Sequence, residues 1–289
     1  MRPNPVKRAL RAGQPSVGTW LSLGSITATR FLARSGFAWL TVDMEHSLVG
    51  WETTTHLFAT IADAGCVALA RVPSNRHENV KRVLDNGGMG IVVPMVNSRA
   101  EAEEAVAATR YPPRGNRSVG GSVHALNFGT TATDYYAHAD EEILVVLQCE
   151  HVKAVEDADA IFSVPGIDAI FVGPNDLAAS MRGKDGRPPS GEATTQAMKH
   201  VLATCKKHGV AAGIHCFSAE EVLHRIEVRH GITRLLGAGQ YLAASPCCFW
   251  PMRCRVWLAP SSIIFSSLVM AMNCQPSSMR WRASSGFMQ

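Results

Sequence analysis

The sequence predicts an α/β fold, and more specifically a (β/α)8 TIM barrel. Short, continuously apolar segments alternate with segments of helical periodicity, which is typical of a parallel sheet covered by helices on both faces. The chain has 289 residues, of which 46% are hydrophobic, enough for a barrel of about 250 residues. Polar and charged residues also follow several of the apolar segments, where a barrel enzyme carries its active site.

The strands and helices are expected in a regular order. In the first half of the chain we expect strands at 17–21, 39–43, 67–72 and 90–93, each followed by a helix, at 27–35, 53–64, 77–86 and 100–110. An irregular segment rich in proline and glycine, 111–126, comes next. The second half predicts strands at 143–148, 167–172 and 210–214 and helices at 192–208 and 219–227.

Closure of the barrel is the least supported part of this prediction. The eighth strand would have to be 232–236, inside a segment of unusual composition. A doubly wound open sheet is the alternative, but no Gly-x-Gly-x-x-Gly follows the first strand to support dinucleotide binding.

Residues 228–289 differ in composition from the rest of the chain. They contain no Asp, Glu or Lys, but six Arg and nine Ser. The net charge is −2 over 1–227 and +6 over 228–289, so the overall +4 does not indicate nucleic-acid binding. We therefore divide the chain into a barrel domain, 1–227, and an anomalous tail, 228–289. We interpret the tail as an out-of-frame or mis-spliced translation; an Arg/Ser-rich, partly disordered extension is the alternative.

Nothing in the sequence predicts export or membrane insertion. The basic N-terminal segment lacks the apolar stretch of a secretory signal, and the longest apolar run, 263–272, is far shorter than the roughly 20 residues that span a bilayer. The cysteines before residue 217 each lie in or beside apolar runs; they are Cys66, Cys149, Cys205 and Cys216. We expect reduced core cysteines in a cytoplasmic protein.

Two carboxylates predict a metal site. Glu150 and Asp176 each follow an apolar strand segment, and in a barrel all parallel strands end on the same face. Two hard oxygen ligands, with the other positions left to water and substrate, suit Mg²⁺ or Mn²⁺ better than zinc. The alternative is that both residues merely cap the helices that follow.

Other chemically versatile residues occur at the same predicted face. Asp43, Glu45 and His46 follow the second strand, Arg71 ends the third, Asp85 ends the next helix, and Gln148 precedes Glu150. A single His or Arg in such a place is more often a surface or capping residue. Several together favour a site, because His exchanges protons near neutral pH and Arg binds carboxylates through two hydrogen bonds.

These motifs together resemble the HpcH/HpaI aldolase family of metal-dependent pyruvate aldolases. The resemblance covers about residues 13–227 and rests on Gly18-Thr19-Trp20, Asp43-x-Glu45-His46, Ala70-Arg71-Val72-Pro73, Tyr111-Pro112-Pro113-x-Gly115-x-Arg117, Gln148-x-Glu150 and Gly173-Pro174-x-Asp176-Leu177. It implies a (β/α)8 barrel that assembles as a homohexamer of paired subunits, which exchange their C-terminal helix.

The resemblance also implies roles for individual residues. Glu150 and Asp176 would bind a divalent cation, Mg²⁺, Mn²⁺ or Co²⁺. Arg71 would bind substrate and steady an enolate, and His46 would act as base with support from Asp43 and Asp85. The pocket would be lined by Trp20 and Gln148, and by Gly173, Pro174 and Asn175, whose backbone would hold the carboxylate of pyruvate.

The implied reaction is retro-aldol cleavage of a 4-hydroxy-2-oxo acid to pyruvate and an aldehyde through a metal-bound pyruvate enolate. No Schiff-base lysine is required, and none of the expected strands contains a lysine. The alternatives are an oxaloacetate decarboxylase or macrophomate synthase-like enzyme, and a non-catalytic remnant with a disrupted C-terminus.

The chain departs from the family pattern at 123–129, on the acceptor side of the site in relatives. Many members carry an arginine there. His124 would be either an extra polar group of the acceptor site or a solvated loop residue, and we favour the latter.

Overall fold

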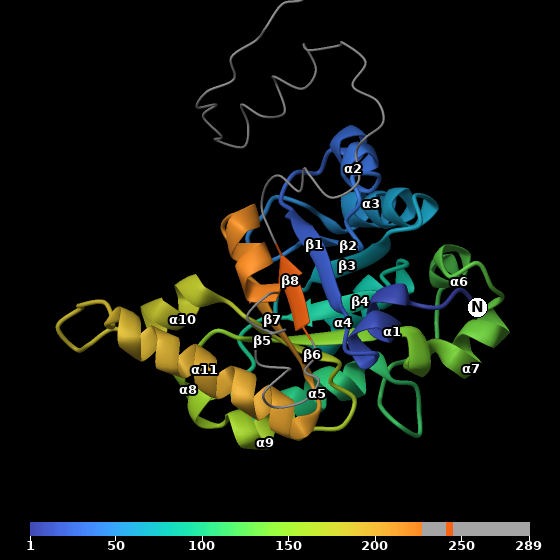
Figure 1. The fold of residues 1–289 in the computed structure, drawn as a ribbon. Helices are drawn as coiled ribbons and strands as arrows, with labels where there is room; N and C mark the ends of the chain where they lie inside the picture. Colours follow the sequence, from blue (N-terminus) through green and yellow to red (C-terminus); the bar gives the residue numbers. More distant parts are fainter. Residues whose placement is uncertain (227–240, 245–289) are drawn as a thin grey trace, which may run out of the picture. The chain divides into compact units, whose positions relative to one another are not determined.

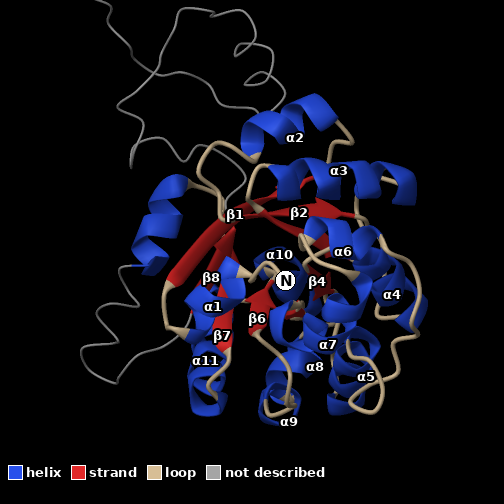
Figure 2. Cartoon of the chain, turned by 90° about the vertical axis from the view of Figure 1, so that its right-hand side faces the viewer, coloured by secondary structure: helices blue, strands red, loops and turns tan. Residues whose placement is uncertain are grey.

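The computed structural model describes residues 1–226 and 241–244, and in these residues parallel strands alternate with helices (Figure 1). Seven strands pair in parallel in sequence order. They are β1 Pro15–Leu21, β2 Trp39–Asp43, β3 Val67–Arg71, β4 Gly90–Val93, β5 Leu144–Cys149, β6 Ala169–Val172 and β7 Ala211–His215. The strands curl into a TIM-barrel-like α/β fold, with helices arranged around the sheet (Figure 2). The expected order of strands is thereby confirmed.

The eighth strand differs from the expected one. Residues 232–236 lie outside the described residues, whereas β8 is Tyr241–Ala244. It pairs in parallel with β7 and with β1, which closes the ring. Apolar patterning did not reveal this strand because it is four residues long and contains no β-branched residue. The sheet therefore includes residues beyond the expected domain boundary at 227.

Most long helices lie close to their expected positions. They are α2 Ile26–Leu32, α3 Trp51–Asp63, α4 His77–Asp85, α5 Arg99–Thr109, α11 Gly191–His208 and a helical segment at 219–226. Further helices were not expected: α1 Pro5–Arg11, α6 Val123–Asn127, α7 Ala132–Glu142, α8 Val152–Glu156, α9 Ala158–Phe162 and α10 Pro174–Ser180. All but α7 are seven residues or shorter, and α7 buries only Tyr135 and Ala139, too few apolar positions for a clear period.

Helix α1 contacts the end of the barrel at which the strands begin. The Asn4 side chain accepts from the Val6 and Lys7 backbone N–H groups and caps the helix. Lys7 is 1% exposed, and its Nζ donates to the Ile143 carbonyl (2.5 Å) and pairs with Asp168 (3.0 Å). Ile143 and Asp168 directly precede β5 and β6, so Lys7 fixes α1 to two neighbouring strands.

The strand register determines which side chains face the interior. Partners in a parallel ladder point to the same side, and side chains alternate along each strand. Gly18 lies opposite Trp39, and a Cβ at Gly18 would be 2.2 Å from Trp39 Cδ2; glycine is therefore needed beside the indole. On β1 to β7 the register gives one interior position nearest each strand end, and these positions are Trp20, Asp43, Arg71, Val92, Gln148, Phe171 and His215.

Candidate active site

Arg71 and Asp43 form a charged pair at the ends of β3 and β2. Arg71 Nε donates to Asp43 Oδ1 (2.9 Å) and Arg71 Nη2 to Asp43 Oδ2 (2.7 Å), a bidentate arrangement. Burial alone would raise the pKa of Asp43, but the hydrogen bonds and charge of Arg71 outweigh it and lower that pKa. Asp43 is consequently ionised at neutral pH and fixes the guanidinium at the strand ends.

A second carboxylate, Glu45, approaches the same guanidinium. Glu45 Oε2 lies 3.3 Å from Arg71 Nε but has no hydrogen-bond partner among the described atoms, because that N–H donates to Asp43. Burial raises the pKa of Glu45, and the negative charges of Asp43 and Asp176 raise it further, against the opposing effect of Arg71 and His46. Glu45 therefore has an unused acceptor in the site.

The inner side of Arg71 rests on an aromatic surface. The guanidinium carbon lies 4.9 Å from the centre of the Trp20 ring, and Trp20 packs edge-to-face on Phe171 with 5.9 Å between the ring centres. Such a cation–π contact stabilises a desolvated guanidinium. Trp20, expected as a pocket residue, thus lies directly beneath the cationic group.

Glu150 is held in a defined orientation just beyond β5. It is 3% exposed; Gln148 Nε2 donates to its Oε2 and the Met95 backbone N–H to its Oε1, each at 2.8 Å. A Cβ on Gly173 would lie 2.7 Å from Glu150 Oε2, so the missing side chain leaves room for the carboxylate. Burial, together with the charges of Glu45 and Asp176, raises the pKa of Glu150 to about 7.

Asp176 lies in the first turn of α10, after Gly173 at the end of β6. It is exposed, and its negative charge raises the pKa values of both Glu150 and Glu45. No set of three or more His, Cys, Asp or Glu with metal-binding geometry occurs in the described part of the chain. Glu150 and Asp176 offer hard oxygen donors, the type that Mg²⁺ binds together with water and substrate oxygens.

His46 lies at the mouth of the site. Its side chain is 64% exposed, and Nε2 is 3.7 Å from Glu45 Oε2. Asp43 Oδ1 accepts from the His46 and Glu45 backbone N–H groups. Asp43 therefore shapes the turn that carries His46 through backbone hydrogen bonds. Pro174 and Asn175 accompany Asp176 in α10.

Asp85 lies at the opposite end of the barrel. It is the last residue of α4, a short turn before β4 begins at Gly90, and its Oδ1 accepts from Arg117 Nη2 (2.7 Å). The structure therefore does not bring Asp85 beside His46 within one chain.

His124 lies near Asp85, and it is not the solvated loop residue that we expected. Its side chain is fully buried, with its ring centre 4.1 Å from that of Tyr135. Burial and the charge of Arg117 lower its pKa. The loop histidine was misjudged because the short helix α6, Val123–Asn127, turns it inward.

Two residues of the site region were not identified from the sequence. Met95, which donates its N–H to Glu150, has a left-handed backbone (φ 54°), a conformation that is uncommon for methionine, and no sequence signal marks it. His215 ends β7 on the interior side, and the charge of Arg71 acts on it. The pattern of polar residues at strand ends would have found His215 had it been applied to the seventh strand.

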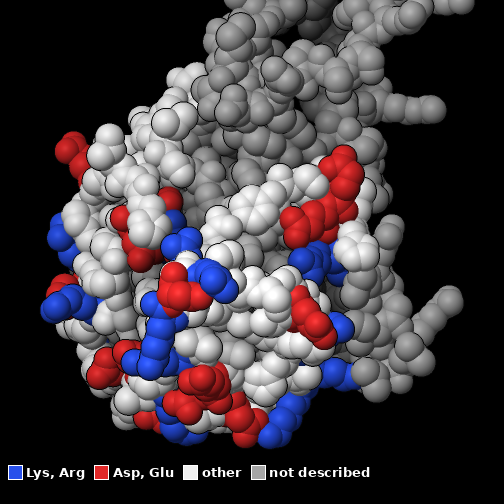
Figure 3. Space-filling model, turned by 90° about the vertical axis from the view of Figure 1, so that its left-hand side faces the viewer, with Lys and Arg blue, Asp and Glu red and all other residues white. Residues whose placement is uncertain are grey.

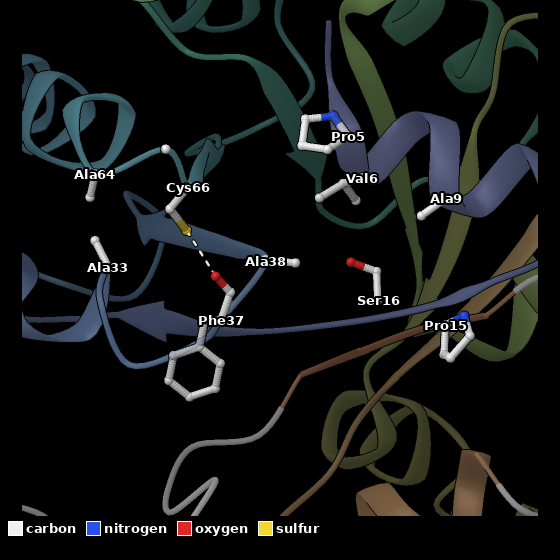
Figure 4. Close-up of a pocket in the computed structure, with 11 residues that line it drawn as sticks. Pro5, Val6, Ala9, Pro15, Ser16, Ala33, Phe37, Ala38, Ala64 and Cys66 are labelled. Carbon is white, nitrogen blue, oxygen red and sulfur yellow. Dashed lines mark hydrogen bonds between the residues drawn. The ribbon is translucent and has the colours of Figure 1, made fainter. Parts of the chain in front are cut away.

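A cavity of about 380 Å³ lies away from these residues, between α1 and the start of β1 (Figure 4). None of the described residues that line it is charged. The Cys66 thiol donates to the Phe37 carbonyl (3.4 Å), and burial raises the pKa of this thiol to about 12. The described lining of the cavity is therefore mainly apolar. The four described cysteines are free and buried, as expected.

Acidic and basic side chains intersperse on the face of the molecule that carries α10 (Figure 3). No single sign of charge covers the described part of that face. None of the described helices is long and apolar enough to cross a membrane.

Comparison with known proteins places these features in a family. A model of the HpcH/HpaI aldolase/citrate lyase family matches residues 16–231. The chain is 38% identical to the hydroxypyruvate/pyruvate aldolase of Cupriavidus necator over 71% of its length and 77% of that protein. It is also 38% identical to the 5-keto-4-deoxy-D-glucarate aldolase of Escherichia coli, over 73% and 82% of the two chains.

A solved structure gives the same assignment. The HpcH/HpaI aldolase/citrate lyase family protein from Burkholderia cenocepacia J2315 superimposes with a TM-score of 0.73 at 34% identity, covering 84% of this chain and 93% of the other. The named relatives are aldolases, and this chain is an enzyme of the class II aldolase type. It belongs to the HpcH/HpaI aldolase/citrate lyase family.

Proposed function

We propose that this protein is a metal-dependent carbon–carbon lyase that cleaves 4-hydroxy-2-oxo acids to pyruvate and an aldehyde through a pyruvate enolate. The observation that carries the proposal is the juxtaposition of Arg71 with Glu150 and Asp176 at the ends of the strands. A cationic side chain beside a pair of carboxylates suits a substrate that bears both a carboxylate and a developing negative charge.

A divalent cation held by Glu150 and Asp176, Mg²⁺, Mn²⁺ or Co²⁺, would stabilise negative charge on the 2-oxo oxygen. Arg71, oriented by Asp43, would bind the oxygen atoms of the substrate. Trp20 and Gln148 would line the pocket, and the backbone around Gly173, Pro174 and Asn175 would hold the pyruvate carboxylate.

His46 would move the proton of the reaction. In the cleavage direction His46 takes the proton of the 4-hydroxyl group. The C3–C4 bond then breaks, the electron pair of that bond enters the enolate, and C4 becomes the carbonyl carbon of the aldehyde. A proton from solvent then converts the enolate to pyruvate. Exposure of the imidazole suits this role, because the proton that it takes up can pass to water.

We also propose that the complete molecule is a (β/α)8 barrel, that it forms a homohexamer and that it is cytoplasmic. Large apolar side chains exposed on the described surface support a subunit interface; they include Leu48, Leu126, Leu23 and Val119, all more than 65% exposed.

Purified protein supplied with Mg²⁺, Mn²⁺ or Co²⁺ should release pyruvate from a panel of 4-hydroxy-2-oxo acids. EDTA should abolish the release, and the cation should restore it. Activity that EDTA leaves unchanged would contradict the metal-dependent function.

A further inference from the structure

His215 faces the interior of the barrel at the same end as the charged site. The ladder pairs Gln148 with Phe171 and Phe171 with Gly213, and Gln148 bonds Glu150 in the site. His215 is two residues beyond Gly213 on β7 and points to the same side. The charge of Arg71, on the opposite side of the barrel, lowers the pKa of the imidazole. Such an effect is expected if both side chains face the barrel interior.

The His215 imidazole has hydrogen-bonding capacity that none of the described residues uses. No described residue hydrogen bonds with it, and its closest aromatic neighbour is Phe217, with 5.0 Å between the ring centres. Glu150 and Asp176, the proposed ligands of the cation beside the pyruvate unit, follow β5 and β6. His215 follows them on β7, so it borders the pocket beside that unit.

The imidazole ring of His215 is suited to hydrogen bonding with a neutral polar group of a substrate. Burial and the positive charge of Arg71 lower the pKa of His215, so near neutral pH it presents one donor and one acceptor nitrogen. A hydroxyl group matches that pair, whereas an alkyl group would leave a partly buried polar ring unsatisfied.

We infer that His215 is a specificity-determining residue that hydrogen bonds a hydroxyl on the aldehyde acceptor and favours 2-hydroxyaldehydes over unsubstituted ones. This inference rests on the proposed aldolase function. It assigns the acceptor side of the site a chemical class, short hydroxylated aldehydes.

Glycolaldehyde and propanal test this inference, because they have the same number of heavy atoms and differ by a hydroxyl in place of a methyl. With pyruvate and Mg²⁺, the wild-type enzyme should show a higher kcat/KM for glycolaldehyde. His215→Leu should lower the glycolaldehyde-to-propanal ratio about tenfold, and His215→Gln should restore part of it. The ratio is taken on one enzyme preparation, so partial loss of folded protein cancels.

His56→Leu on α3 is the matched control, since His56 is exposed on the helix surface, and it should keep the wild-type ratio. A wild-type enzyme without preference for glycolaldehyde, or an unchanged ratio in His215→Leu, would overturn the inference. Exchange of the pyruvate methyl protons in D₂O separates the two proposals. If the wild-type protein with Mg²⁺ fails to exchange them, the aldolase function itself fails, whereas exchange without acceptor preference rejects only the role of His215.

Discussion

Glu150 is a carboxylate that the fold holds at an electrostatic cost. It is buried near two further acidic side chains, and its pKa is raised to about 7. The folded protein therefore retains a proton that the unfolded chain loses near its ordinary pKa of 4.5. As the pH rises from about 4.5 to about 7, Glu150 ionises in the unfolded chain but stays protonated in the folded protein, so the free energy of unfolding falls. Above pH 7 this loss of stability is complete.

Glu150→Gln should stabilise the cation-free protein at pH 8 by up to about 3 kcal/mol and have little effect at pH 4. The same change should abolish the increase in Tm that Mg²⁺ produces in the wild type, because a cation ligand is lost. Thermal unfolding at the two pH values, with and without Mg²⁺, measures both effects. Glu104→Gln, on the exposed face of α5, is the control. An equal stability change at pH 4 and pH 8 would contradict the raised pKa.

His46→Ala should slow retro-aldol cleavage by about 10² to 10⁴-fold and slow the decarboxylation of oxaloacetate much less. Decarboxylation produces the enolate by loss of CO₂ and needs no base at a hydroxyl group. Steady-state rates of pyruvate release from the two substrates give the comparison. Equal losses in both reactions would remove His46 from proton transfer.

Trp20, which only the family resemblance implied, lies against Arg71. The sequence predicted that Arg71 and Glu150 lie at one face, because strand ends in a barrel converge, and the structure brings these two residues into one region. It could not predict Met95, whose contribution is a backbone N–H in a left-handed turn. Asp85 was assigned to the site face although it ends a helix, and in a barrel the helix that follows a strand ends near the face where the strands begin.

At the scale of elements, α1 contributes most through one buried cation. Burial lowers the pKa of Lys7, while the charge of Asp168 opposes that effect. The helix was missed from the sequence because seven residues with a basic surface give no clear apolar period.

Lys7→Met should lower the free energy of unfolding by about 3 kcal/mol, because it leaves the Asp168 carboxylate and the Ile143 carbonyl without this donor. Urea denaturation of the purified protein measures the change. Lys199→Met, at an exposed position of α11, should change stability by less than about 0.5 kcal/mol. A similar small effect of Lys7→Met would show that α1 does not stabilise the start of the sheet.

At the scale of the whole molecule, seven apolar strands were enough to predict a barrel-like α/β fold, since each is regular and bounded by turns. The position of the eighth strand could not be predicted, because its four residues carry little hydrophobic pattern. Composition also suggested that the chain becomes anomalous after 227, yet β8 lies beyond that point and pairs on both sides.

Ending the chain after Phe249 should leave a soluble barrel, whereas ending it after Glu227 should give aggregated protein. The shorter chain lacks β8, so the edges of β1 and β7 would be open to other chains. Expression of both forms, followed by sedimentation and circular dichroism, makes the comparison. A soluble, folded 1–227 fragment would show that β8 is dispensable.

The full-length protein should elute as a hexamer in size-exclusion chromatography with light scattering, because exposed apolar side chains such as Leu48 and Leu126 would be covered. A monomer at micromolar concentration would contradict the proposed assembly and favour the non-catalytic alternative.

The pairing of β1 with β8 joins the first strand of the sheet to the last, Pro15 with Tyr241. During synthesis the first strand therefore leaves the ribosome long before its second neighbour exists. At about 5–20 residues per second, the nascent chain waits more than ten seconds with an unpaired β1 edge. Chaperones that shield such an edge would consequently raise the yield of folded protein without changing its equilibrium stability.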